Sequence, residues 1–306
     1  MIKIIDDKKT CRRSLYFLGS RVLSWYRVRL AMDKINNRLE NLDRAITQLM
    51  NERTNRLGAM GIPRALQEVQ IKFLDQFDAF CNSQSLTYWL DFGTLLGAIR
   101  NSKFIPWDDD VDVTMLRHDF DIILKQCDDN RVLPDGYYFK YYPEIGLIKM
   151  HNKDLPECIG MDIFVADAVG RAMNIQEKLD MSKNINEDSA HDQLKDACQR
   201  LHYFVKKVNE LGIDFVGNLS SARTIVYGFD FRHRAHPSIF LDKNDIFPLE
   251  TVIFEGKNYP CPKNTSVHLT LLYGDYLSPD WTKLPHNGAS DISIEDMLRI
   301  NNFAKE

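Results

Sequence analysis

YWLDFGTLLGAIRNSKFIPWDDDVDVTMLRHDF, residues 88–120, is the stretch of the chain from which its fold follows. Its apolar start belongs to a strand predicted over 86–90, and a glycine turn then leads into a short helix predicted over 94–100. Alternating valines predict a second strand over 111–115. Strands and helices that follow one another so closely indicate a body of mixed α/β or α+β class.

Three aspartates, Asp108, Asp110 and Asp112, stand two residues apart around the start of the second strand. In an extended chain, residues i, i+2 and i+4 project from one face, so this spacing aims the three carboxylates in one direction. Like charges at that distance repel one another unless a cation lies between them, and hard divalent cations prefer oxygen ligands. The spacing therefore predicts a Mg²⁺ or Mn²⁺ site, and the alternative is a solvated acidic loop.

The turn Phe92-Gly93-Thr94 lies between the first strand and the short helix. A glycine here lets phosphate oxygens approach the backbone, and a helix N-terminus offers N–H donors and a favourable dipole. Thr94 is expected either to cap the helix or to bond a phosphate. A Gly-Thr turn for phosphate, followed by a strand of alternating aspartates for metal, is the organisation of the nucleotidyltransferase fold, because one ion then contacts both carboxylate and phosphate.

Further candidates for the site lie after this turn. Asp162 falls in an apolar, strand-like run, where a lone acid is unfavourable unless it is paired or bound to metal. Asp167 is a second acidic candidate, for which a position in a turn is equally compatible. Arg100 is expected to bind phosphate as a planar fork or to favour the C-terminal end of its helix. Lys149 and His151 share one strand face as candidates for phosphate binding, although this setting favours a structural role for His151.

The remainder of the chain supports one large domain over 64–306. Apolar spacing predicts a helix over 64–81, a further strand over 160–165 and a final helix from Ser293. Residues 174–212 are polar with helical periodicity. We therefore expect a mixed sheet flanked by helices.

Residues 1–63 are expected to form a separate helical segment. Residues 8–30 include seven basic and no acidic residues, among leucines and aromatic residues, which fits either peripheral contact with an anionic membrane or a helix packed on the main body. Apolar residues over 28–50 follow a heptad period, which predicts either a coiled coil that forms a homo-oligomer or a helix folded back on the domain. Glycines and a proline within 58–63 end this helix and mark a linker.

The composition is that of a globular protein, with 306 residues, 44% of them hydrophobic and 27% charged, and a formal net charge of −4. This mild acidity argues against a nucleic-acid binder that works through bulk charge. The six cysteines are scattered without a C-x-x-C pair, which favours free thiols in a reducing compartment. No apolar run is long enough to span a membrane and the start does not resemble a signal peptide, so we expect a cytoplasmic protein, with any membrane contact peripheral and at the inner face of the cell membrane.

Three blocks of the sequence resemble the LicD/fukutin family of phosphotransferases. They are LDFGTLLGAIR with FIPWDDDVDVTMLRHDF, then GMDIFVAD, then IFPLETVIFEGKNYPCPKNTSVHLTLLYGDYLSP, over roughly residues 70–290. The resemblance implies a nucleotidyltransferase-like fold that binds Mg²⁺ or Mn²⁺. It also implies transfer of phosphocholine, ribitol phosphate, glycerol phosphate or a similar group from a CDP-linked donor to a hydroxyl of a glycan acceptor, with release of CMP. The family context suggests a bacterial surface polysaccharide, such as capsule, lipopolysaccharide or teichoic acid.

Carried onto this sequence, the resemblance places metal-binding and catalytic acids at Asp108, Asp110, Asp112 and Asp162. It places a phosphate-binding turn at Gly93 and Thr94. Two departures from the family pattern are visible: Leu116 stands where many relatives have proline, and the zinc-binding cysteines of fukutin-related protein have no counterpart, so no zinc is expected. The implied mechanism is in-line attack by a sugar hydroxyl on the phosphorus next to the alcohol. Two alternatives stay open, a D-x-D glycosyltransferase that uses a nucleotide-sugar and a non-catalytic scaffold of glycan assembly.

Overall fold

The chain divides into two compact units, residues 1–56 with 281–283 and residues 57–280 with 284–306. The candidate site lies in the larger unit. The computed structural model describes residues 3–7, 12–16, 34, 35, 38, 62–128, 131–143, 145–186, 197–210, 216, 219–227, 239–277 and 292–305.

In the smaller unit, β1 (Lys3–Asp7) and β2 (Arg12–Tyr16) form an antiparallel hairpin. The expectation that residues 1–63 are helical is therefore wrong for these two segments. Two adjacent isoleucines favour extended backbone in β1. β2 forms because its backbone N–H and C=O groups find partners in β1, which the spacing of its side chains does not reveal. Residues 34, 35 and 38 are helical, and the rest of the predicted coiled coil lies outside the described residues. The predicted self-association and membrane contact stay predictions.

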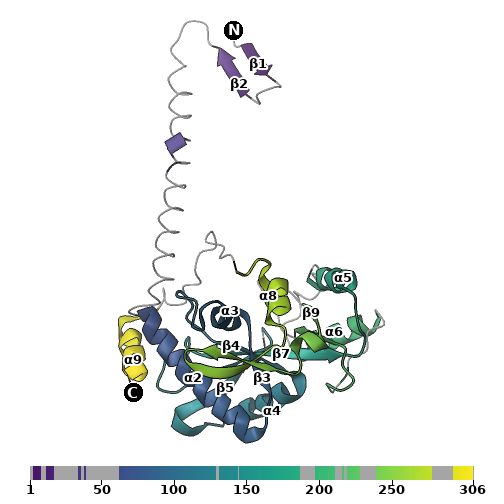
Figure 1. Ribbon diagram of the computed structural model, residues 1–306. Coiled ribbons are helices and arrows are strands. Elements are labelled where there is room, and N and C mark those ends of the chain that lie inside the picture. The colour runs from purple at the N-terminus through teal and green to yellow at the C-terminus, as the bar shows by residue number, and fades with distance from the viewer. Residues whose placement is uncertain are drawn as a thin grey trace. The chain divides into compact units, whose positions relative to one another are not determined.

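A seven-stranded mixed sheet forms the centre of the larger unit (Figure 1). Its main path has the spatial order β3-β4-β7-β6-β5, and β8 and β9 continue it from the second half of β7. β4 and β7 are parallel, and every other neighbouring pair in this sheet is antiparallel. The strands are β3 (Tyr88–Leu90), β4 (Asp112–Leu116), β5 (Tyr137–Tyr142), β6 (Leu147–Asn152), β7 (Met161–Val169), β8 (Thr224–Tyr227) and β9 (Phe240–Asp242).

Helices flank the sheet, with α2 and α4 on one side and α3 and α8 on the other, and α9 packs along α2 (Figure 1). The helices and strands predicted over 64–81, 86–90, 94–100, 111–115 and 160–165 and from Ser293 are all present, with ends shifted by at most four residues. The expected mixed α/β fold is confirmed. The helices and the remaining hairpin are α2 (Ile62–Gln84), α3 (Phe92–Asn101), α4 (Arg117–Asp128), α5 (Ile175–Asn186), α6 (Ala197–Glu210), α7 (Lys243–Ile246), α8 (Thr265–Tyr273), α9 (Ile294–Lys305), β10 (Glu250–Phe254) and β11 (Lys257–Cys261).

Each face of the sheet packs on its own apolar core. The larger core takes the apolar stripe of α2, including Phe73, and Val113 of β4. Burial of one such phenylalanine contributes about 2 kcal/mol. The smaller core includes Phe164 of β7. Because side chains alternate along a strand, Asp112 and Asp162 project from the same face as Phe164, at the end where β4 and β7 begin.

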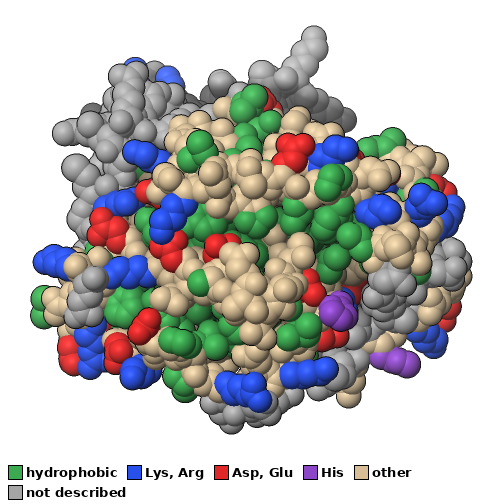
Figure 2. Space-filling view, turned by 60° about the horizontal axis from the view of Figure 1, so that its bottom comes forward, with side chains coloured by type: hydrophobic (Ala, Val, Ile, Leu, Met, Phe, Trp, Pro, Cys, Tyr) green, Lys and Arg blue, Asp and Glu red, His purple; other side chains and the backbone are tan. Residues whose placement is uncertain are grey.

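The face of the molecule drawn in Figure 2 carries both signs of charge. Lys and Arg side chains lie among Asp and Glu side chains, around apolar patches. Among the described residues, Cys81, Cys158 and Cys261 are free thiols. In the described part of the chain, no helix combines the length and the apolar character needed to cross a bilayer.

Candidate metal and phosphotransfer site

Five half-buried aspartates from two segments converge where β4 and β7 begin. Carboxylate oxygens of Asp108, Asp109 and Asp110 lie within 4.8 Å of one another, and those of Asp110, Asp112 and Asp162 do the same. Asp112 and Asp162 are register partners on parallel strands, which places their carboxylates side by side on one face of the sheet. The structure thus brings all four predicted acids together, and Asp110 belongs to both groups.

The first acids of the cluster lie in a loop rather than on a strand. β4 begins at Asp112, so the alternation of an extended strand does not account for how Asp108 and Asp110 point inward. That part of the sequence prediction is corrected. The same correction explains why Asp109 was missed, because strict alternation would have directed its side chain away from its neighbours, whereas a loop has no such rule.

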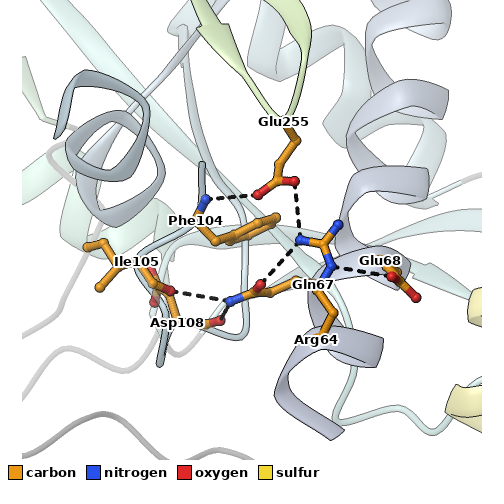
Figure 3. A network of polar contacts seen from close by, with 7 residues as sticks. All are labelled: Arg64, Gln67, Glu68, Phe104, Ile105, Asp108 and Glu255. Atoms are coloured by element: carbon orange, nitrogen blue, oxygen red, sulfur yellow. Dashed lines mark hydrogen bonds and ion pairs between the residues drawn. The ribbon is translucent and has the colours of Figure 1, made fainter. Parts of the chain in front are cut away.

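Buried contacts from α2 hold this loop in place (Figure 3). Gln67, only 2% exposed, donates through Nε2 to the carbonyl oxygens of Asp108 at 2.9 Å and Ile105 at 3.3 Å. Glu255, in the turn between β10 and β11, accepts from the backbone N–H of Phe104 at 3.2 Å and pairs with Arg64 at 3.1 Å. The acidic loop is therefore attached both to α2 and to a hairpin from the C-terminal part of the chain.

A second glutamine on α2 holds the other acidic segment. Gln70, also 2% exposed, donates through Nε2 to the Gly160 carbonyl at 3.0 Å, two residues before Asp162. Gln67 and Gln70 are three residues apart and therefore lie on the same side of their helix. One face of α2 thus sets the positions of both segments that carry the carboxylates.

Burial and mutual repulsion raise the pKa values of three of these carboxyl groups. Burial, followed by the charges of Asp110 and Asp109, raises the pKa of Asp108 well above its ordinary value. Burial and the neighbouring acids do the same to the pKa of Asp112. Burial raises the pKa of Asp162 only to about 6, because the charge of Lys149 opposes this effect. Lys149 Nζ lies 2.7 Å from Asp162 Oδ1.

The donor set suits a divalent cation. Every candidate ligand is a carboxylate oxygen, the type that Mg²⁺ and Mn²⁺ prefer over the nitrogen and sulfur ligands of softer metals. Apart from its ion pair with Lys149, the buried Oδ1 of Asp162 has no hydrogen-bond partner among the described residues. A cation held by these aspartates would also offset the repulsion among the carboxylates that raises their pKa values. The residues present fit the predicted metal, and its binding stays a prediction.

The first turn of α3 packs directly against the acidic cluster. A Cβ on Gly93 would lie 2.7 Å from Asp108 Oδ2 and 3.6 Å from Asp112 Oδ2. The hydroxyl of Thr94, which is 1% exposed, accepts from the backbone N–H of Asp112 at 2.9 Å. Thr94 does not cap the helix, because the cap is Asp91, whose carboxylate accepts from the Phe92 N–H. Contact of Gly93 and Thr94 with phosphate stays a prediction.

Residues 85–184 match the family described as LicD/FKTN/FKRP, nucleotidyltransferase domain, a range that contains all five aspartates. A Haemophilus influenzae protein named lipopolysaccharide cholinephosphotransferase LicD is 28% identical over 262 residues, which cover 73% of this chain and 95% of that relative. Residues 85–184 are a LicD-family domain. Shorter matches join it to uncharacterized proteins of Rickettsia typhi, 34% identical over 83 residues, and Rickettsia prowazekii, 45% identical over 75 residues. The Rickettsia typhi match covers 26% of this chain and 23% of that relative. The Rickettsia prowazekii match covers 23% of this chain and 26% of that relative.

The other predicted residues of this LicD-family site have different surroundings. Arg100 donates through Nε and Nη2 to the carbonyl oxygen of Tyr276, at 2.6 Å from Nε, so it attaches the segment after α8 to the end of α3. His151 is 1% exposed and bonded through its two ring nitrogens to the Ile159 carbonyl and the Tyr142 hydroxyl, each at 3.0 Å. Burial lowers the pKa of His151. Both side chains are therefore engaged in structural contacts, whereas Lys149 reaches the LicD-family carboxylates directly.

Asp167 lies apart from the LicD-family acids. It is fully buried on β7, five residues beyond Asp162 and hence on the opposite face of the strand. Arg117, at the start of α4, donates to both its carboxylate oxygens at 2.8 Å. The alternative that Asp167 lies in a turn is wrong, since it lies within β7. Asp167 is an ion-pair partner of Arg117 outside the acidic cluster.

The residues that hold the acidic segments and the first turn of α3 in place were not predicted from the sequence. Asp91 had a recognisable signal, since an aspartate just before a helix is a common N-cap. Gln67 and Gln70 gave none beyond being polar positions on the apolar side of a helix. His268, which lies 2.6 Å from Asp91, comes from α8, far away in the sequence. Contacts of this kind depend on which elements the fold places side by side.

Proposed function

We propose that this chain is a phosphotransferase that moves a phosphorylated alcohol from a CDP-linked donor to a hydroxyl of a cell-surface glycan, releasing CMP. The observation that carries the proposal is the convergence of Asp110, in the loop before β4, with Asp112 and Asp162, which lie at the start of two adjacent parallel strands. Its similarity to a protein named lipopolysaccharide cholinephosphotransferase, over 95% of that protein's length, supports a transferase that acts on a surface glycan.

We also propose that the five aspartates Asp108, Asp109, Asp110, Asp112 and Asp162 hold Mg²⁺ or Mn²⁺. When bound there, such an ion neutralises charge on a diphosphate and on its leaving group. The rigidity of the ligand set comes from the chain itself, because Gln67 and Gln70 bind the backbones of both acidic segments. Ligands held in this way need little rearrangement when a substrate binds.

Two further tasks fall to side chains of the site. Lys149 presents a cation beside Asp162 and would hold a non-bridging oxygen of the donor phosphate. The acceptor hydroxyl must lose a proton as it attacks, and a carboxylate of the cluster, Asp108 or Asp162, would accept it at a side-chain oxygen. In the ion-free protein, burial raises the pKa of both groups.

The test is a donor screen with purified full-length chain. CDP-choline, CDP-ribitol, CDP-glycerol and UDP-glucose are offered singly with a glycan acceptor, with Mg²⁺, Mn²⁺ or EDTA, and release of CMP or UDP is measured. We expect one CDP-alcohol to be consumed in a metal-dependent reaction and to raise the melting temperature in the presence of metal. Consumption of UDP-glucose instead would support a glycosyltransferase, and consumption of no donor would support a scaffold.

Matched variants connect this activity to the aspartates. Asp110→Asn and Asp112→Asn remove charge at the centre of the cluster with little change in shape. Each is expected to lower turnover at least about 100-fold. The control is Asp180→Asn, on the exposed surface of α5, which is expected to keep full activity. Folded Asp110→Asn and Asp112→Asn proteins with normal turnover would contradict the proposal.

A further inference from the structure

A buried polar network centred on Asp91 adjoins the acidic cluster. Asp91 is fully buried, and its carboxylate accepts hydrogen bonds from five donors. The donors belong to β3, α3, β4, β8 and α8, so one side chain connects five elements. They are Trp89 Nε1 (3.0 Å), Phe92 N (2.8 Å), Thr114 Oγ1 (2.7 Å), Tyr227 Oη (2.7 Å) and His268 Nε2 (2.6 Å).

Asp91 is held as a carboxylate by this network and has no capacity left for a ligand. Burial by itself would raise the pKa of Asp91, but the charge of His268 and the hydrogen bonds from His268, Tyr227 and Thr114 bring it below its ordinary value. Five donors exceed the four lone-pair sites of a carboxylate. Asp91 therefore does not belong to the metal ligands, although only one residue separates it from Gly93.

The backbone of Asp112 is attached to the same turn. The N–H of Asp91 donates to the Asp112 carbonyl at 3.1 Å, and the Thr94 hydroxyl accepts from the Asp112 N–H at 2.9 Å. Both backbone groups of this central acid are thus bonded to the start of α3. Any shift of that turn would move Asp112, and with it the carboxylate that lies in the cluster.

This turn also contains a strained residue. Phe92 has a φ of +43°, a conformation that residues other than glycine rarely adopt. Its N–H is bonded to Asp91, and its ring centroid lies 4.5 Å from that of Phe164 and 4.9 Å from that of Tyr227. Strained backbone persists only where the surroundings enforce it, and it is concentrated at functional sites. Here the Asp91 network supplies the enforcing contacts.

We propose that Asp91, Tyr227 and His268 are positioning residues that hold the first turn of α3 against the acidic cluster and thereby set the position of Asp112. The inference rests on the proposed function, because it assigns these residues to the same metal site. It also makes α8 and β8 part of that site, although both lie outside the matched range 85–184.

The test compares two identical substitutions. Tyr227→Phe removes one hydroxyl bonded to a carboxylate at 2.7 Å, and the control Tyr88→Phe removes a hydroxyl bonded to Asp78 at the same 2.7 Å, on the side of β3 away from the cluster. Mn²⁺ affinity is measured by calorimetry together with the melting temperature. We expect Tyr227→Phe to weaken Mn²⁺ binding about 10- to 100-fold and Tyr88→Phe to leave it within about twofold, for similar losses of melting temperature.

A second pair of variants covers the case in which Tyr227→Phe does not fold. His268→Gln keeps an N–H donor toward Asp91 and is expected to retain most of the Mn²⁺ affinity, whereas His268→Leu removes the donor and is expected to lose it about 10- to 100-fold. Wild-type affinity in Tyr227→Phe, or equal affinities in the two His268 variants, would overturn the inference alone. A wild-type chain that binds no Mn²⁺ would overturn both the inference and the proposed metal site.

Discussion

The substitution Gly93→Ala is expected to separate the stability of the fold from its affinity for metal. The added Cβ would lie 2.7 Å from Asp108 Oδ2, about 0.7 Å short of the 3.4 Å at which ordinary contact begins. The atom in the way is the end of a side chain, so Asp108 can rotate away while the backbone stays in place. Gly93 is helical without a positive φ, and alanine in a helix is favoured over glycine by about 0.5–1 kcal/mol.

The expected result is therefore an ion-free protein at least as stable as the wild type that binds Mn²⁺ about 10- to 100-fold more weakly, since one ligand is displaced. Calorimetric titration with Mn²⁺ gives the affinity, and thermal melting with EDTA gives the stability. Asn101→Ala, exposed in the last turn of the same helix, is the control that alters helix propensity without touching the cluster. Wild-type affinity in Gly93→Ala would refute both the packing argument and the assignment of Asp108 as a ligand.

Three further predictions concern the support, the charge and the limits of the site. Gln67→Leu removes the bonds to the acidic loop and should raise the metal concentration needed for half-maximal activity about tenfold, whereas Gln84→Leu, exposed at the end of α2, should not. Burial raises the pKa of Asp162 to about 6 from an ordinary 3.8, so the ion-free fold loses stability from this group as pH rises through that interval. Melting curves should accordingly show a larger stabilisation by Mn²⁺ at about pH 7.5 than at about pH 5, and an equal one would contradict it. Asp167→Asn breaks the buried pair with Arg117 and should lower the free energy of unfolding by about 3 kcal/mol while leaving Mn²⁺ affinity unchanged; weaker binding would place Asp167 in the site after all.

Several parts of the site could be predicted because the relevant signals are local. Buried valines around Asp112 mark a strand, and a lone acid at Asp162 within an apolar run marks a position that needs a partner. The helical stripe of α2 is equally local, since it depends only on spacing along the chain. The prediction failed where the chain left regular structure, as at Asp109, whose side chain obeys no alternation.

The tertiary structure decided which of the candidates work together. Arg100, His151 and Asp167 carry groups suited to a phosphate or metal site, yet each is engaged by a partner that comes into reach only on folding. Asp91 and His268 meet in the same way, across 177 positions of the chain. Amino-acid sequence by itself determined that acids gather at the start of two strands, because strand periodicity is a property of neighbouring residues. Which polar groups are bound by distant partners, and which stay directed at a ligand, depends on how the layers pack, because hydrogen bonds and ion pairs act only at contact distance.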